Sequence, residues 1–418
     1  MTTTRYIPLS ACIASTLAAM ALLNSLSTAA DWPTWRGPKR DGISTEKGLL
    51  AAWPAGGPPL AWKATGCGVG YSSVSVANGR VFTMGDGPDG SNVRAFDEKS
   101  GKPVWTSPVL GKAGGNYEGT RCTPTVDGDA IYALGQFGDL ICLDAAKGTE
   151  RWRKNLSKDF GGGAPGWNYT ESPLIDGNNV MVTPGGDKGT IVALDKKTGA
   201  LVWQSKDYKD GAQYSSLVPA DINGVHQYIQ LTGQSVAGVD AATGALLWRA
   251  DRKGETAIIT TPVYANNQVF VTSAYGVGCN AFKITKDGSS FKTEELYANK
   301  NMANHHGGVI LLGDYLYGSS DGKGWVCQDF KTGAIKWAEK SVGKGSIAHA
   351  DGHFYFRSED GKGTVALVEA TPDGYKETGR FDPPDRSNKN SWPHPVIANG
   401  RLYLRDQDVI LSYDVRKK

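Results

Sequence analysis

The chain has 418 residues, with 45 Lys and Arg against 42 Asp and Glu and a formal net charge of +3. This near-neutral balance includes no basic run, so nucleic acid is not expected as a partner. The 54 Gly and 20 Pro residues indicate a turn-rich, all-β chain.

The first 30 residues have the pattern of a secretory signal peptide. Arg5 precedes an apolar run over 7–26, and small residues lead up to Ala30. Leu9 to Cys12 also look like a lipoprotein signal, but the apolar run continues well past Cys12, so lipidation is not expected. Cleavage near Ala30 would leave no run long enough to span a membrane, which predicts a periplasmic or secreted monomer without a transmembrane segment.

Residues 31–59 contain Trp32, Trp35 and Trp53, and we expect them to form a strap across the outside of the domain. The next segment, around Trp62, has the pattern of an orphan outer strand. The last repeat ends near Asp414 without such a strand. Pairing these two segments would close a ring and remove its free sheet edges.

Over 60–418 the chain repeats a spacing of Asp, four residues on to Gly and four on to Trp. The Asp can accept hydrogen bonds from the backbone of a turn, the Gly supplies a positive φ, and the Trp packs between neighbouring sheets. A period of about 45 to 50 residues is typical of propellers and related arrays. The five copies are Asp97–Gly101–Trp105, Asp144–Gly148–Trp152, Asp195–Gly199–Trp203, Asp240–Gly244–Trp248 and Asp329–Gly333–Trp337.

Aligning the turns that precede each second strand gives eight repeats. The fifth and seventh have degenerate outer hairpins, around Asp287 and Gly374, where no Trp follows at the usual offset. The sequence therefore predicts an all-β, eight-bladed propeller of four-stranded antiparallel blades.

The repeated Leu-Asp-x-x-Thr-Gly-x-x-x-Trp pattern resembles that of the PQQ-binding-like β-propellers. This family includes quinoprotein alcohol dehydrogenases and the outer-membrane β-barrel assembly lipoprotein. The segments 31–38, 135–140 and 392–395 are similar to a narrower group of secreted bacterial propellers, some of them named polyvinylalcohol dehydrogenase-like. The resemblance implies the fold far more strongly than an activity.

In a propeller, the loops that lead into the inner strands share one face with the loops between the second and third strands. Polar and aromatic side chains should therefore meet around one mouth of the channel, which is a common position for a ligand site. Small residues of the inner strands fit a packing role, whereas Arg121, Glu171, His306 and His394 are larger and more polar than packing requires. The candidate site residues are Tyr71, Arg121, Glu171, Asp187, Tyr214, His306, Trp392, His394 and Arg405.

We expect no metal and no cofactor. The histidines lack a spacing such as H-x-x-x-H, and the cysteines form no C-x-x-C or haem motif and are expected to be small core residues. The resembled dehydrogenases hold PQQ over a Trp, beneath a disulfide between adjacent cysteines and beside an Asp base. This chain has no adjacent cysteines.

The sequence favours a binding module that takes a small molecule, a glycan or a protein at the rim of the channel. The alternative is an oxidoreductase that depends on PQQ or calcium and acts on an alcohol, polyol or sugar.

Overall fold

The computed structural model describes residues 1–2 and 30–417 of the chain. Most of the predicted signal peptide, with Cys12, lies outside the described residues. Within the part that is described, no helix is long and apolar enough to cross a membrane.

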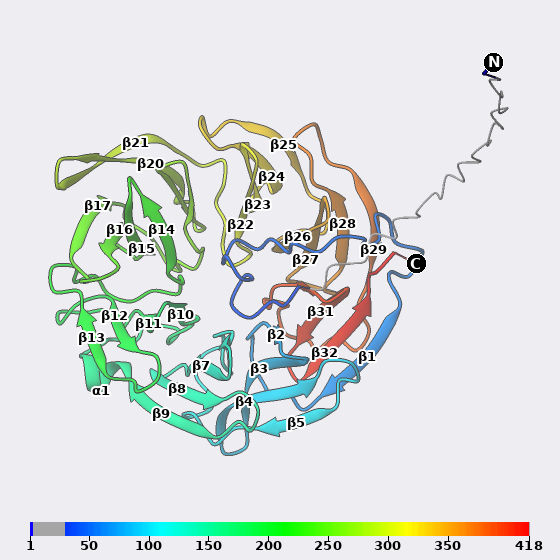
Figure 1. Ribbon diagram of the computed structural model, residues 1–418, viewed down its shortest axis with the longest axis horizontal. Helices are drawn as coiled ribbons and strands as arrows, with labels where there is room; N and C mark the ends of the chain where they lie inside the picture. Colours follow the sequence, from blue (N-terminus) through cyan, green and yellow to red (C-terminus); the bar gives the residue numbers. More distant parts are fainter. Residues whose placement is uncertain (3–29, 418) are drawn as a thin grey trace.

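The described strands form eight separate four-stranded antiparallel sheets, arranged as the blades of a ring (Figure 1). This confirms the predicted all-β, eight-bladed propeller. From the inner to the outer strand, blades 1 to 4 are β2 (Ser75–Ala77), β3 (Arg80–Gly87), β4 (Gly90–Asp97) and β5 (Pro103–Thr106); β6 (Thr125–Asp127), β7 (Ala130–Leu134), β8 (Asp139–Asp144) and β9 (Glu150–Asn155); β10 (Leu174–Asp176), β11 (Asn179–Val182), β12 (Val192–Asp195) and β13 (Leu201–Gln204); and β14 (Val218–Ile222), β15 (Val225–Leu231), β16 (Ser235–Asp240) and β17 (Leu246–Asp251).

Blades 5 to 8 continue the same order around the ring. They are β18 (Val263–Ala265), β19 (Gln268–Ser273), β20 (Gly278–Asp287) and β21 (Ser290–Asn299); β22 (Val309–Leu312), β23 (Tyr315–Ser320), β24 (Gly324–Asp329) and β25 (Ile335–Glu339); β26 (Gly345–Ala350), β27 (His353–Ser358), β28 (Val365–Glu369) and β29 (Glu377–Phe381); and β30 (Val396–Ala398), β31 (Arg401–Asp406), β32 (Val409–Asp414) and β1 (Leu60–Thr65). A short helix, α1 (Leu156–Phe160), follows β9.

The ring closes as predicted, because β1 pairs antiparallel with β32, the last strand of the chain. The indole of Trp62 lies against Gly101 of blade 1, and its Nε1 donates to the carbonyl of Glu98 at 2.9 Å. Trp62 therefore takes the position in blade 8 that the repeated Trp takes in other blades.

The Asp, Gly and Trp of each repeat link neighbouring blades. Asp195 Oδ1 accepts hydrogen bonds from the backbone nitrogens of two turn residues, at 2.8 and 3.1 Å, and Gly199 has a φ of +70°. A Cβ on Gly199 would lie only 2.8 Å from the ring of Trp152 in the preceding blade. The glycine is thus needed for the turn and for close packing of the adjacent blade.

Residues 31–44, which we call the plug, correct the expectation of an outer strap. Figure 1 shows this blue segment inside the ring, where Trp32 pairs with Val76 of the innermost strand β2. Trp32 is 3% exposed, and the buried Arg40 donates to the carbonyls of Ser172 and Pro173. A Trp-rich sequence is as compatible with a surface strap as with a plug. Only the tertiary structure shows that these side chains fill the channel.

The rest of the predicted strap runs along blades 7 and 8, closer to the expectation. The Leu50 nitrogen donates to the carbonyl of Val415, and the ring of Trp53 meets Phe381 edge-on at 5.3 Å. The five cysteines among the described residues are buried and unpaired, as expected for core residues.

Candidate functional site

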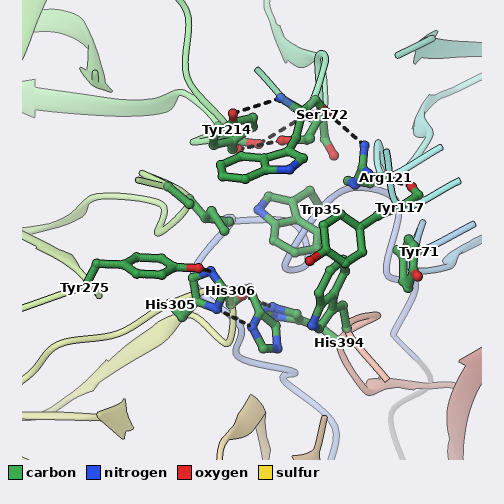
Figure 2. A pocket seen from close by; sticks show the side chains of 16 residues that line it. Trp35, Tyr71, Tyr117, Arg121, Ser172, Tyr214, Tyr275, His305, His306 and His394 are labelled. Atoms are coloured by element: carbon green, nitrogen blue, oxygen red, sulfur yellow. Dashed lines mark hydrogen bonds between the residues drawn. The ribbon is translucent and has the colours of Figure 1, made fainter. Parts of the chain in front are cut away.

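A cavity of about 170 Å³ opens at one mouth of the channel, and we call it the cup. Figure 2 shows its side chains converging from several blades around Trp35. The lining residues are Trp35, Tyr71, Tyr117, Arg121, Trp167, Thr170, Ser172, Tyr214, Ser216, Ala257, Ile259, Tyr275, His305, His306, Trp392 and His394.

Most of the cup is built by connections between blades. Arg121 lies between β5 and β6, Tyr214 between β13 and β14, and Trp392 between β29 and β30. Tyr275 comes from the turn between β19 and β20. The segments that lead into most of the blades add one to three side chains each, so the cup exists only when the ring is closed.

Trp35 of the plug contributes to the cup from inside the channel. Its Nε1 donates to Thr261 Oγ1 at 3.1 Å, and its ring lies 4.5 Å from the ring of His394. These contacts join the plug to blade 5 and to the loop before blade 8. The plug therefore supplies both channel packing and a wall of the cup.

Aromatic rings make up one side of the cup. The ring of Trp392 lies 4.5 Å from that of Tyr71 and 5.2 Å from that of Tyr117. Nε1 of Trp392 donates to Glu359 Oε2 at 3.0 Å, which fixes the indole in the wall. Such a surface is apolar across its ring faces and polar at its edges.

Two tyrosines at the cup are unusually exposed. Tyr117 is 54% exposed and Tyr275 is 49% exposed, and they have φ values of +55° and +57°. A tyrosine in the left-handed region costs about 1 to 2 kcal/mol, which an asparagine or glycine would largely avoid. Folding alone does not explain large aromatic side chains at these two positions.

Arg121 is the only Arg or Lys among the described residues that line the cup. It donates to the backbone carbonyls of Trp167, Asn116 and Tyr117 at 2.6 to 2.9 Å. Its guanidinium lies 6.0 Å from the ring centre of Tyr71, and burial lowers its pKa. Arg121 thus ties two loops together and gives the cup a positive edge.

Burial lowers the pKa of all three histidines of the cup, which favours their uncharged form at neutral pH. Burial lowers the pKa of His305 to about 4 and that of His394 to about 3, and it holds the pKa of His306 well below its usual value. His394 Nε2 lies 2.8 Å from the carbonyl of His306, so it donates and its Nδ1 carries no proton.

The structure brings six of the nine sequence candidates into the cup: Tyr71, Arg121, Tyr214, His306, Trp392 and His394. The other three do not line it. Asp187 lies in an exposed turn between β11 and β12. Glu171 and Arg405 are buried behind the cup wall, each only 1% exposed.

We call three buried charged side chains the collar: Glu171, Arg405 and Arg40 of the plug. Glu171 accepts from the backbone nitrogen of Thr183 at 2.7 Å, and burial raises its pKa to about 7, opposed by Arg40. Arg405 donates to the carbonyls of Ser72, Gly68 and Gln407 at 3.0 Å and to Thr83 Oγ1 at 2.6 Å. Apart from Arg40 Nε, which has no hydrogen-bond partner among the described residues, the polar groups of the collar are used within the protein.

The candidate list omitted several lining residues, chiefly Trp35, Tyr117, Trp167, Tyr275 and His305. Trp35 was assigned to the strap. The position of Tyr117 depends on a loop that contains Gly115 and Gly119, both at positive φ. In the sequence, Tyr117 is marked by the glycines on either side of it. This pattern indicates a loop but does not indicate the direction of the side chain.

Two imidazoles and a carboxylate also meet at the cup wall. One ligand atom from each of His305, His306 and Glu359 lies within 4.8 Å of the other two. No metal was expected from the sequence, because the histidines lack a ligand spacing such as H-x-x-x-H. The cluster forms where the loop before blade 6 meets a turn of blade 7, its neighbour in the ring.

A protein-family model described as "Outer membrane protein assembly factor BamB" matches residues 89–339. The chain belongs to this family of PQQ-like β-propellers. A curated BamB from Kangiella koreensis is 28% identical over 213 residues, which cover 50% of this chain and 49% of that protein. The chain thus spans about half the length of this curated relative.

Two solved structures share the fold of this PQQ-like propeller. BamB from Moraxella catarrhalis has a TM-score of 0.61 at 18% identity, covering 83% of this chain and 95% of that one. Quinohemoprotein alcohol dehydrogenase from Comamonas testosteroni has a TM-score of 0.66 at 14% identity, covering 95% of this chain and 82% of that one. The likeness reaches both assembly factors and dehydrogenases, so the fold does not choose between them.

The residues of the cup do not fit PQQ with Ca²⁺. The carboxylates of PQQ need cationic partners, but both terminal nitrogens of Arg121 already donate to backbone carbonyls. Ca²⁺ needs oxygen ligands, whereas two of the three donors in the cluster are imidazoles. The described cysteines are all buried and separated along the chain.

Proposed function

We propose that this PQQ-like propeller is a binding module of the cell envelope, and that its cup binds a ring-shaped ligand, a sugar unit of a glycan. The main support is the set of aromatic side chains around a concave site, with Trp35 at its base. Sugar rings present C–H faces that pack on aromatic rings and hydroxyls that bond to Tyr, Trp and His edges.

The exposed tyrosines support the same proposal. Tyr117 and Tyr275 combine about 50% exposure with a positive φ. Strained, exposed aromatic residues at the opening of a cavity are explained by contact with a ligand better than by folding. The positive charge of Arg121 at the edge of the cup would favour an anionic sugar over a cationic one.

A protein partner is the second candidate, because the family match carries the name of an outer membrane protein assembly factor. That name also supports a location outside the cytoplasm. An extended peptide with aromatic side chains would meet the same rings, so the cup itself is the place to separate the two ligands. We propose no quinone-dependent reaction, because the cup lacks a cationic clamp.

The test is a binding titration with neutral and acidic mono- and oligosaccharides, followed by intrinsic Trp fluorescence and calorimetry. We expect saturable binding that Tyr117→Ala weakens about tenfold, because one stacking face is lost. Leu201→Ala is the matched control, since Leu201 is 53% exposed but lies on the outer strand β13.

Two results would contradict the glycan proposal. The first is no response to any saccharide combined with Tyr117-dependent binding of aromatic-rich peptides, which would assign the cup to a protein partner. The second is saccharide binding that Tyr117→Ala and Tyr275→Ala leave unchanged, which would move the site away from the cup.

A further inference from the structure

The wall of the cup contains a buried imidazole without a strong hydrogen bond. His306 is 8% exposed, and its Nε2 has no partner among the described residues. Its Nδ1 lies 3.5 Å from His305 Nδ1 and 3.3 Å from Glu359 Oε2, both long for hydrogen bonds. Buried polar atoms in proteins are nearly always satisfied, so Nδ1, with its two neighbours at long distances, needs an additional partner.

The spacing of these atoms matches the ligands of one metal ion. Bonds of about 2.0 to 2.1 Å in a tetrahedral site put neighbouring ligand atoms roughly 3.3 to 3.4 Å apart. The separations of 3.3 and 3.5 Å around His306 Nδ1 are close to this value. We propose that His305, His306 and Glu359 bind a divalent transition metal, Zn²⁺ in the first place, at the wall of the cup.

Neighbouring groups already hold the proposed ligands in position. Tyr275 Oη lies 3.3 Å from His305 Nε2, which leaves Nδ1 of that ring for the metal. The carbonyl of His306 accepts from His394 Nε2 at 2.8 Å. The backbone of Glu359 bonds to Lys344 and Ser391, at 2.9 and 2.7 Å.

Lys344 is compatible with a bound metal. Its Nζ lies 3.8 Å from Glu359 Oε1 and 3.3 Å from Asp321 Oδ1, and the side chain is 31% exposed. Lys344 can keep its contact with Asp321 when a metal is bound. Glu359 Oε2, which is the oxygen near His306, is then left for the metal. Trp392 donates to the same Oε2, which has a second lone pair for the metal.

Two imidazoles and one carboxylate favour Zn²⁺ or another borderline metal over Ca²⁺ and Mg²⁺. Three protein ligands leave a fourth position. His305 and His306 both line the cup, so this position would be available to water or to an oxygen atom of a ligand. The metal site does not depend on the proposed glycan, because the metal is held by protein side chains alone.

The experiment titrates chelator-treated full-length mature protein with Zn²⁺ alone, by calorimetry and by competition with a chromophoric chelator. Co²⁺ provides a second readout, because tetrahedral coordination with imidazole ligands gives visible d–d absorption. We expect one high-affinity site per chain and a loss of affinity of at least about tenfold in both His305→Ala and Glu359→Gln. Glu359→Gln keeps the size of the side chain and an acceptor for Trp392, and thermal melts verify that each variant is folded.

The matched control is His226→Ala, because His226 lies outside the cup beside Asp176 and Asp221. It should leave Zn²⁺ affinity and the Co²⁺ spectrum unchanged. Absence of stoichiometric Zn²⁺ binding, or binding that depends on His226 and survives both cup variants, would overturn the proposal. The saccharide titration is run with and without Zn²⁺, so that failure of one proposal is distinguishable from failure of the other.

Discussion

The cup and the collar both include side chains that the sequence placed at one mouth of the channel, yet they use polar groups in opposite ways. In the collar, Arg405 gives its donors to four neighbouring groups at 2.6 to 3.0 Å, and Glu171 accepts from the backbone of Thr183. In the cup, Tyr117 and Tyr275 are about half exposed. A polar residue near a propeller channel therefore indicates function only when its groups are not already used by the fold.

Arg121 shows that the division is not absolute. Its guanidinium donates to three backbone carbonyls, as a collar residue would, but it also lines the cup. A variant of Arg121 would change loop structure and binding together. Residues that lie clearly on one side of the division are better tests.

The largest expected effect is at Arg405. Arg405→Ala should lower the free energy of unfolding by about 3 kcal/mol or more, because it strands several buried acceptors between blades 8 and 1. Urea unfolding measures the loss. The control Arg380→Ala removes a 51% exposed side chain paired with Glu377, and it should cost less than about 1 kcal/mol. Similar losses in the two variants would erase the distinction between collar and surface.

Glu171 should make stability depend on pH. Its folded pKa of about 7 lies above its ordinary value of 4.5, so the folded state binds the proton more tightly. The resulting stabilisation is complete below pH 4.5 and is lost as pH rises through 7. Between pH 4 and pH 8, wild type should lose about 2 to 3 kcal/mol relative to Glu171→Gln.

Urea unfolding of wild type and Glu171→Gln at several pH values gives this difference directly, and any constant cost of the substitution cancels. Parallel curves between pH 4 and pH 8 would show that the Glu171 carboxyl titrates normally. The collar would then contain a Glu171 carboxylate that is charged and fully paired, instead of one that burial keeps partly protonated near pH 7.

The smallest expected effect on stability is at Tyr275. Tyr275→Gly relieves a φ of +57°, but it also makes the unfolded chain more flexible. The relief of strain and the added flexibility have opposite effects on the free energy of unfolding and nearly cancel. Stability should therefore change by no more than about 0.5 kcal/mol, while ligand affinity falls. A thermal melt and the saccharide titration measure both. A loss above about 2 kcal/mol would mean that Tyr275 is a packing residue.

Part of the cup could be predicted from the sequence, because propeller geometry assigns inner-strand starts to one face. Trp392 and His306 were found in this way. Asp187 was also selected by this reasoning, but its side chain lies in an exposed turn outside the cup. Position along a repeat predicts the face of the ring, whereas loop conformation decides which side chains enter the cavity.

The sequence alone determined the eight blades and their closure by β1. Asp195 and Gly199 form a local turn, and Trp203 follows four residues after Gly199. The pattern can therefore be recognised within a single repeat. The plug and the cluster of His305, His306 and Glu359 were decided by the tertiary structure. They depend on contacts between segments far apart in the chain, such as Trp35 with Thr261. Such contacts form only when the eight blades meet around one axis.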